Sequence, residues 1–172
     1  DMTPELLALH NGEYQLVANI PYYITGEILR QFLESSVQPS AMTLLVQDEV
    51  AQRIARDTKE SILSLSVKAY GTPRYVKKVP RGAFSPAPRV DSAILQIAHI
   101  SREKFAGVSE EQFFRTVRAG FSSKRKQLIG NLQQIAPRER LLELFSMLHI
   151  PEKARAEDVP LTQWLALTRA LT

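Results

Sequence analysis

Four consecutive residues near the start of the chain, Asn19-Ile20-Pro21-Tyr22, carry the clearest chemical signal in the sequence. The amide oxygen of Asn19 and the backbone carbonyl of Pro21 can both accept a hydrogen bond from an NH2 group, and the Tyr22 ring offers a face on which a flat base can stack. Proline restricts its own φ and biases the residue before it toward extended geometry, so both acceptors are in place before a ligand arrives. Such a corner suits a methyltransferase that grips the exocyclic amine of adenine and aims its lone pair at one carbon.

The position of this corner supports a binding role. It follows a short apolar run that predicts a buried strand over 16–20. Ligands of open α/β sheets lie beyond the carboxyl ends of the strands. The alternative is a plain strand-to-helix turn, in which the Asn19 side chain hydrogen-bonds its own loop.

A second candidate is Phe84, within Ala83-Phe84-Ser85-Pro86-Ala87-Pro88. The two prolines hold the segment extended, so a phenylalanine presented there could stack on an extruded base, an interaction worth roughly 1–3 kcal/mol. The alternative is that Phe84 fills the core between two edge strands.

Positive charge is concentrated in two long stretches without any acid. The net charge is +4, and neither residues 61–90 nor residues 112–138 contain Asp or Glu. Such stretches are typical of a surface that meets a polyanion, although a solvated basic face without a partner is the alternative. The candidates for phosphate binding lie on one predicted helix and at the start of the next: Arg115, Arg118, Lys124, Arg125 and Lys126.

Several other chemistries find no support in the sequence. There is no cysteine, the three histidines lack ligand spacing, and none of the seven glycines forms a G-x-G-x-x-G loop, so we expect no metal site and no visible dinucleotide cradle. Asp48, Glu49 and Glu60 have no placed partner for hydrolysis and are interpreted as helix-surface charge. No apolar run is long enough to span a membrane and no signal-peptide pattern is present, so we expect a cytoplasmic protein.

The first hundred residues predict alternating strands and helices. Apolar spacing indicates strands at 16–20, 41–46, 74–79 and 93–100, and helices at 24–33, 48–56 and 61–70. Thr25 is a candidate cap, and the continuous apolar run 41–46 indicates a strand covered on both faces. This pattern predicts an α/β layer with a largely parallel sheet, whose last two strands pair antiparallel at an edge.

No strand signal remains after about residue 103. A capping box, Ser109 with Gln112, opens a helix to about 121, and further helices are expected at 124–134, 137–148 and 161–171. With 44% hydrophobic and 23% charged residues the chain is globular. We therefore expect two domains, residues 1–103 and a small helical domain at 104–172.

Five ordered segments resemble the ribosomal RNA adenine N6,N6-dimethyltransferase family, and within it the bacterial small-subunit dimethyladenosine transferases fit best. Residues 16–25 resemble the family signature around Asn-Ile-Pro-Tyr, and 46–53 resemble its Gln-x-Glu-Val-x-x-Arg segment. Residues 84–93 resemble its Phe-x-Pro-x-Pro-x-Val-Asp-Ser loop. Residues 121–128 and 155–157 resemble its Phe-x-x-Arg-Arg-Lys-x-Leu and Arg-Ala-Glu segments.

The resemblance implies a fold, an activity and roles for named residues. The fold is the C-terminal part of a Rossmann-like class I methyltransferase domain followed by a small all-α domain. The activity is S-adenosylmethionine-dependent dimethylation of adenines in small-subunit (16S) rRNA, with a role in ribosome biogenesis and with ribosomal RNA, or the small ribosomal subunit, as partner. Asn19, Pro21 and Tyr22 would be catalytic, Tyr22 and Phe84 would sandwich the base, and the five basic residues named above would bind RNA.

The chain departs from the family pattern at its start. The family's first strand, its glycine-rich cofactor loop and its acidic ribose-binding residue have no counterpart, so the chain resembles a family member without roughly its first third. Asn19 and, less directly, Asp1 are the candidate cofactor-binding residues. We expect this fragment to be inactive alone and to expose apolar sheet edges.

Two alternatives to small-subunit dimethylation remain open at this stage. One is a large-subunit rRNA adenine methylase that confers antibiotic resistance, since that group shares the Asn-Ile-Pro-Tyr turn. The other is a non-enzymatic rRNA-binding or assembly fragment.

Overall fold

The computed structural model describes residues 8–172, which cluster into two compact units. The first unit comprises the chain up to residue 57 together with 66–102, and the second comprises 58–65 together with 103–172. The predicted boundary after residue 103 lies next to this division, but residues 58–65 were expected in the first domain and instead group with the second unit. Each unit is described by itself below.

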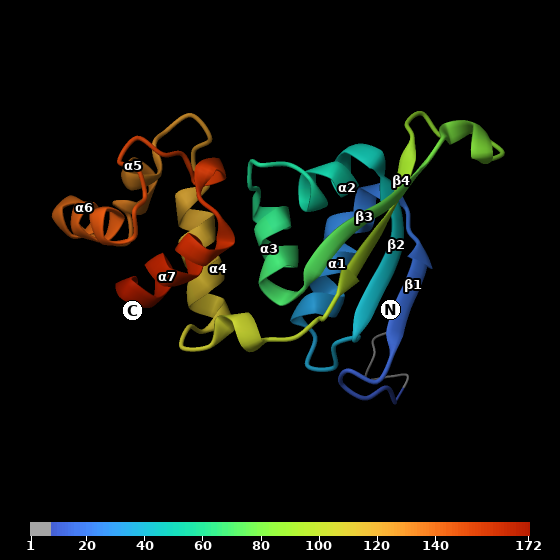
Figure 1. Ribbon diagram of the computed structural model, residues 1–172, viewed down its shortest axis with the longest axis horizontal. Coiled ribbons are helices and arrows are strands. Elements are labelled where there is room, and N and C mark those ends of the chain that lie inside the picture. The colour runs from blue at the N-terminus through green and yellow to red at the C-terminus, as the bar shows by residue number, and fades with distance from the viewer. Residues whose placement is uncertain (1–7) are drawn as a thin grey trace. The chain divides into compact units, whose positions relative to one another are not determined.

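Between residues 8 and 102 the structure contains four strands and three α-helices (Figure 1). They are β1 (Gln15–Asn19), α1 (Thr25–Glu34), β2 (Ala41–Gln47), α2 (Asp48–Ala55), α3 (Ile62–Tyr70), β3 (Thr72–Val79) and β4 (Ser92–Ala98). These strands and helices are the ones that the apolar spacing predicts, with ends shifted by one or two residues.

The four strands form one sheet in the order β1-β2-β4-β3. Strands β1 and β2 pair in parallel, and β4 pairs antiparallel with both β2 and β3, so β3 runs in the same direction as β1 and β2. Three of the four strands thus run one way, as expected for a largely parallel sheet, and β4 alone is reversed because it follows β3 without a crossover helix. The antiparallel pairing of the last two strands is confirmed, with β3 at one edge of the sheet and β4 between β2 and β3.

Strand reversal has a consequence for where the loops lie. Ser92, the first residue of β4, pairs with Gln47 at the end of β2 and with Val79 at the end of β3. The loop between β3 and β4 therefore leaves the sheet on the side where β1 and β2 have their carboxyl ends. Figure 1 shows this green loop extending beyond the strand ends.

The core of the first unit lies on one face of the sheet. Alternate residues of β2, Met42, Leu44 and Val46, are completely buried, while the residues between them are half-buried. The prediction that residues 41–46 are fully covered on both faces is thus too strong. On the neighbouring helices the buried apolar positions recur three or four residues apart, as an amphipathic helix requires: Leu29 and Leu33 on α1, and Ala51 and Ile54 on α2.

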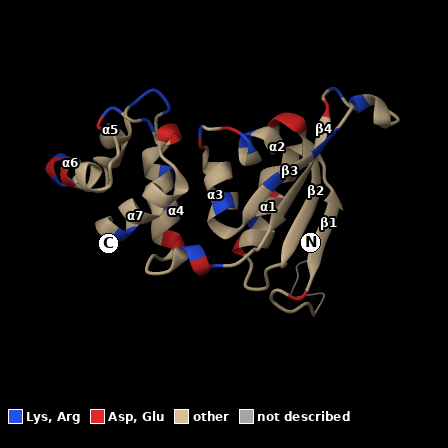
Figure 2. Cartoon of the chain, viewed as in Figure 1, with Lys and Arg blue, Asp and Glu red and all other residues tan. Residues whose placement is uncertain are grey.

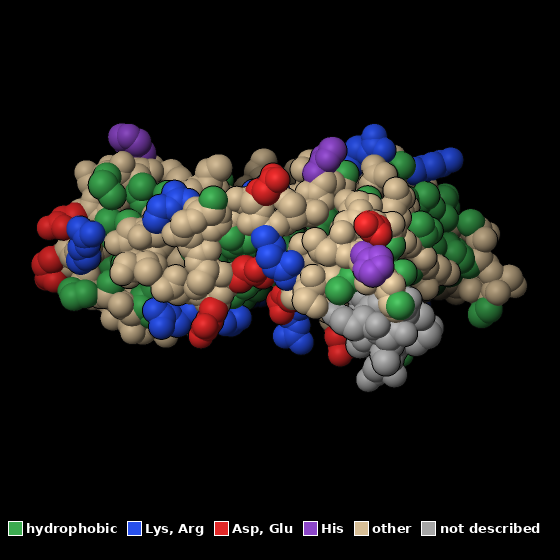
Figure 3. Space-filling view, turned by 90° about the horizontal axis from the view of Figure 1, so that it is seen from below, with side chains coloured by type: hydrophobic (Ala, Val, Ile, Leu, Met, Phe, Trp, Pro, Cys, Tyr) green, Lys and Arg blue, Asp and Glu red, His purple; other side chains and the backbone are tan. Residues whose placement is uncertain are grey.

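The sheet also presents apolar surface. Strand β1 lies at the edge of the sheet, and the Val17 side chain on it is 76% exposed. Figure 3 shows hydrophobic side chains of the first unit reaching the surface in the view from below. An exposed apolar edge of this kind favours aggregation or a covering partner, and both stay predictions.

The second unit is helical beyond residue 103. Its helices are α4 (Glu110–Gly120), α5 (Leu128–Leu132), α6 (Arg138–Met147) and α7 (Leu161–Leu171). The buried Trp164 stacks on Phe121 with ring centroids 5.8 Å apart, and a side chain at Gly120 would place its Cβ 2.3 Å from the Trp164 ring. The packing of α4 against α7 therefore requires glycine at that position.

Three predicted helix starts can be compared with the structure. The capping box at Ser109 and Gln112 is confirmed at the start of α4. Thr25 does not cap α1, since it is the first helical residue and its hydroxyl donates to the Tyr22 carbonyl (3.1 Å). The helix expected over 124–134 is only the five residues of α5, because Lys124–Lys126 form a turn in which the Lys126 N–H donates to the Ser123 carbonyl.

Among residues 8–172, no helix has the length and apolar character needed to cross a membrane.

Candidate functional site: a cavity at the ends of the strands

The Asn19 corner lies at the carboxyl end of β1. Asn19 is the last residue of the strand and is exposed, whereas Ile20 after it is buried. Pro21, with φ −58° and ψ 134°, then directs the chain into a short 3-10 turn, Tyr22–Ile24. Within residues 8–172 the Asn19 amide has no hydrogen-bond partner, so the described part of the chain gives no support to the alternative in which this side chain only braces its own loop.

A cavity of about 340 Å³ joins two segments that lie far apart in the sequence. It is lined by Asn19, Pro21 and Tyr22 of the first segment and by Phe84, Pro86 and Pro88 of the second. Phe84 is half-buried at this cavity, so it does not fill the core between the edge strands as the alternative interpretation held. We call this the aromatic cavity.

Tyr22 is held by a residue that sequence reasoning did not single out. Its hydroxyl lies 2.6 Å from the Oγ of Ser92, which is completely buried at the start of β4. A ring fixed at its far end keeps one orientation, which favours stacking because no rotamer freedom is then lost on binding. A serine four residues after Pro88, immediately before the strand predicted at 93–100, was the available signal.

The Pro21 carbonyl is already in use as an acceptor. It takes a hydrogen bond from the Ile24 N–H at 3.2 Å, which closes the short turn. A carbonyl oxygen has two lone pairs, so one remains for an amine in the cavity.

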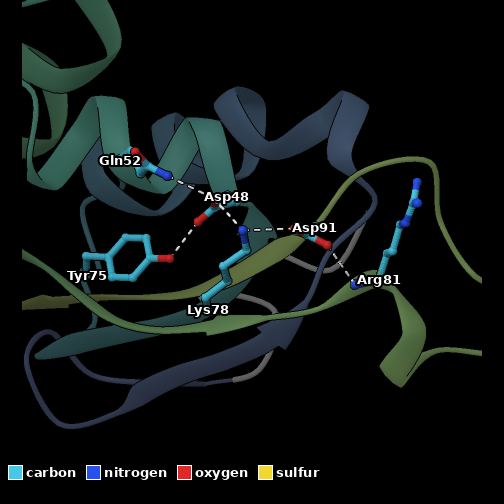
Figure 4. Close-up of polar contacts among 6 residues, drawn as sticks. All are labelled: Asp48, Gln52, Tyr75, Lys78, Arg81 and Asp91. Carbon is cyan, nitrogen blue, oxygen red and sulfur yellow. Dashed lines mark hydrogen bonds and ion pairs between the residues drawn. The ribbon is translucent and has the colours of Figure 1, made fainter.

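Asp91 holds the loop that carries Phe84 (Figure 4). One carboxylate oxygen accepts from the Arg81 N–H at 2.9 Å, and the other pairs with the Lys78 ammonium at 2.9 Å. The two residues at the ends of the loop are thereby tied together. Ser92 and Asp91 are adjacent, so the start of β4 positions both segments that line the aromatic cavity.

The same network reaches the first turn of α2. Asp48 accepts from the Tyr75 hydroxyl at 2.6 Å and from Gln52 at 2.8 Å, and it lies 3.8 Å from the Lys78 ammonium (Figure 4). The interpretation of Asp48 as helix-surface charge is therefore wrong, because its side chain is largely covered and bonded across the sheet. Glu49 is on the surface, bonded to Arg53, as expected.

The network shifts the proton affinities of its members. The Arg81 N–H, and then Lys78, hold the pKa of Asp91 below its ordinary value of 3.8, and Asp91 in turn raises the pKa of Lys78 above 10.5. The hydrogen bond to Asp48 raises the pKa of Tyr75 above 10.0. The pKa of Asp91 is lower in the folded than in the unfolded protein. Asp91 therefore stabilises the fold fully when the pH is above its unfolded-state pKa, and this stabilisation is lost as the pH falls through its folded-state pKa.

The role of Ser92 gives a testable prediction. Ser92→Ala should weaken the binding of a flat aromatic ring against Tyr22 by about tenfold, because one hydrogen bond and the orientation of the Tyr22 ring are lost. Ser92→Thr, which keeps the hydroxyl, should recover part of this affinity. A fall in melting temperature with unchanged affinity for the ring would mean that Ser92 is only structural.

The five predicted phosphate-binding residues all belong to the second unit and are all exposed. Arg115 and Arg118 lie on α4, and the other three lie in the turn before α5. Figure 2 shows this blue connection between α4 and α5. None of the five has an ion-pair partner within residues 8–172.

Of the two residues expected to bind the cofactor, Asp1 and Asn19, the structure describes only Asn19. Asp1 lies outside the described residues. Asn19 lines the aromatic cavity, but residues 8–172 contain no glycine-rich loop that could cradle a nucleoside. The described residues therefore do not fit S-adenosylmethionine by themselves. They also contain no group of three or more His, Cys, Asp or Glu that could hold a metal ion.

Comparison with known proteins decides the family. The sequence profile of the family described as ribosomal RNA adenine dimethylase matches residues 3–172. The chain belongs to this family. Curated relatives agree: a ribosomal RNA small subunit methyltransferase A of Dehalococcoides mccartyi (strain ATCC BAA-2100 / JCM 16839 / KCTC 5957 / BAV1) is 42% identical over 168 residues, covering 96% of this chain and 58% of the relative. One of Fusobacterium nucleatum is 36% identical, covering 92% of this chain and 62% of the relative.

Solved structures of related proteins support the family fold. The structure of the 23S rRNA methyltransferase ErmE has a TM-score of 0.73 at 26% identity, covering 96% of this chain and 68% of that one. A dimethyladenosine transferase from Plasmodium falciparum has a TM-score of 0.76 at 23% identity, covering 90% and 65%. The first unit thus has the fold of the C-terminal part of a Rossmann-like class I methyltransferase domain. The chain spans about 60% of the length of the first curated relatives.

Proposed function

We propose that the chain is the target-binding part of an enzyme that dimethylates the N6 amine of adenines in small-subunit rRNA. Its family is described as ribosomal RNA adenine dimethylase, and its curated relatives are named ribosomal RNA small subunit methyltransferase A. The observation that carries this proposal is the aromatic cavity, where Asn19, Pro21 and Tyr22 meet Phe84. Acceptors for an amine and aromatic rings for a base are what a flipped adenine requires.

The described residues suggest how the target amine is handled. An adenine that leaves its stack enters between Tyr22 and Phe84. The Asn19 amide oxygen and the free lone pair of the Pro21 carbonyl accept from the N6 amine, which draws the nitrogen lone pair out of ring conjugation. No side chain of the cavity is a strong base, and none is needed, since the N–H becomes acidic as the new N–C bond forms. Fixed orientation and exclusion of water then supply most of the rate.

The methyl group would come from S-adenosylmethionine, which the family implies as donor. Asn19 is the one cofactor candidate within the described residues, since Asp1 lies outside them, so these residues account for the acceptor amine and not for the donor. The reaction would take place in the cytoplasm, on rRNA or the assembling small subunit.

The large-subunit methylase is the second candidate, and the likeness to ErmE is the observation in its favour. Transfer of labelled methyl groups from S-adenosylmethionine by the full-length protein separates the two. Label in N6,N6-dimethyladenosine of undermethylated small-subunit rRNA is expected, and label only in large-subunit rRNA would overturn the proposal. RNA binding without transfer, and without calorimetric binding of S-adenosylmethionine, would identify a non-enzymatic assembly factor.

The basic turn of the second unit gives a prediction about RNA affinity. Replacing Lys124, Arg125 and Lys126 together by glutamine should weaken RNA binding and flatten its dependence on salt, by up to about 0.7–0.9 in the logarithmic slope for each phosphate that the variant no longer binds. Binding titrations at several salt concentrations measure this. Lys153→Gln, at another exposed lysine of the same unit, is the control, and an unchanged slope in the triple variant would exclude the turn from the RNA interface.

A further inference from the structure

A second cavity of about 330 Å³ also lies at the carboxyl ends of the strands. It is lined by Gln47, Asp48 and Glu49, where β2 ends and α2 begins, and by Arg81, Arg89 and Asp91 of the loop between β3 and β4. We call this the polar cavity. Nothing in the proposed handling of the adenine uses it.

Within residues 8–172, the charged groups of the polar cavity that lack a partner are cationic. Each of its three carboxylates is bonded: Asp48 to Tyr75 and Gln52, Glu49 to Arg53, and Asp91 to Lys78 and the Arg81 N–H. The guanidinium groups of Arg81 and Arg89, in contrast, make no hydrogen bond or ion pair within residues 8–172. Unpaired guanidinium groups at a cavity favour an anion, and their planar geometry suits a phosphate.

The polar cavity adjoins the aromatic cavity. The loop lines both, with Phe84, Pro86 and Pro88 facing one and Arg81, Arg89 and Asp91 facing the other. Pro88 and Arg89 are consecutive residues, so their Cα atoms are about 3.8 Å apart. An anion held by Arg89 would therefore lie beside the aromatic cavity, where the phosphate next to a bound nucleoside is expected.

We propose that the polar cavity binds the phosphodiester group next to the target adenosine, with Arg81 and Arg89 as its partners. This inference rests on the proposed function, because it takes the occupant of the aromatic cavity to be an adenine of RNA. The subsite would grip the backbone beside the extruded nucleotide and so fix how deeply the base enters.

The test uses short single-stranded RNA with one adenosine, bound to the 172-residue chain. Three further probes carry a neutral methylphosphonate on the 5′ side of the adenosine, the same group on the 3′ side, or an abasic residue in place of the adenosine. The protein variants are Arg81→Gln with Arg89→Gln, and as control Arg30→Gln, an exposed arginine of α1 that lines neither cavity. The bond from the Arg81 N–H to Asp91 involves the backbone and survives the substitution, and circular dichroism checks the fold.

For the wild type and the Arg30 variant, one of the two neutral linkages should weaken binding by about tenfold. The double variant should bind the natural RNA about tenfold more weakly, and the neutral linkage should weaken its binding no further. The logarithm of its affinity should also fall less steeply with the logarithm of the salt concentration, by about 0.7 for each phosphate that it no longer binds. The proposal is overturned if wild-type binding ignores both neutral linkages or if the double variant still discriminates against one of them. The abasic probe separates the proposed function from the phosphate subsite. If the wild type binds the abasic probe as tightly as the natural RNA, the proposed function is contradicted. If its affinity depends on the base but on neither linkage, only the phosphate subsite is contradicted.

Discussion

Asn19→Ala in the full-length protein is expected to lower the rate of methyl transfer by at least about a hundredfold while RNA affinity stays nearly unchanged. Asn19 is exposed at the end of β1 and lines the aromatic cavity, and its amide has no competing partner within residues 8–172. The hydrogen bond that the substitution removes acts on the reacting amine and hardly on the bulk of the RNA. Single-turnover transfer of labelled methyl groups, together with a separate RNA-binding titration, measures both quantities.

The matched control is Gln15→Ala at the other end of the same strand. Gln15 is also an exposed amide on β1, but it lines neither cavity, so its replacement should leave transfer unchanged. Equal rates in the Asn19 variant and the wild type would refute the assignment of Asn19 to the amine. Equal reductions in both variants would point to damage to β1 as a whole.

Phe84→Ala should weaken the capture of the adenine by about tenfold or more, since stacking on an aromatic ring is worth roughly 1–3 kcal/mol per base. Phe84 lines the aromatic cavity together with Tyr22. The difference in affinity between an adenosine-containing RNA and its abasic counterpart isolates this contribution, because both probes share the same backbone.

Conservative changes at Phe84 separate stacking from simple filling of space. Phe84→Trp should keep the discrimination between the two probes, whereas Phe84→Leu should abolish most of it. If the leucine variant discriminates as well as the wild type, Phe84 acts as an apolar wall and not as a stacking partner.

The local structure of the first unit could be predicted because it depends on neighbours in sequence. Apolar spacing sufficed for α1, α2 and the four strands, and the Ser109–Gln112 capping box marked the start of α4. The antiparallel pairing of β3 and β4 was expected because no helix is predicted between them, but the position of β4 between β2 and β3 was not, because it depends on the order of the strands across the sheet. Apolar alternation within a strand carries no information about the direction of its partner.

The candidate site was predictable in its parts but not in its assembly. The residue types at Asn19, Tyr22 and Phe84 indicated their chemistry, yet the meeting of the two segments is a property of the sheet order. The bond from Tyr22 to Ser92 joins residues 70 positions apart, and no spacing rule reaches that far. The interpretation of Asp48 as surface charge fails for the same reason, since its partners Tyr75 and Lys78 come from β3.

The hairpin reversal described above also bears on how such enzymes diversify. A loop that is clamped at its mouth by Asp91, and that otherwise projects from the ends of the strands, can gain, lose or exchange residues while the ladder of the sheet stays intact. Substitutions confined to the loop between β3 and β4 could thus change which RNA the protein prefers, without any repacking of the protein interior. Proteins with closely similar folds that act on different ribosomal RNAs would then differ mainly in the sequence of this loop.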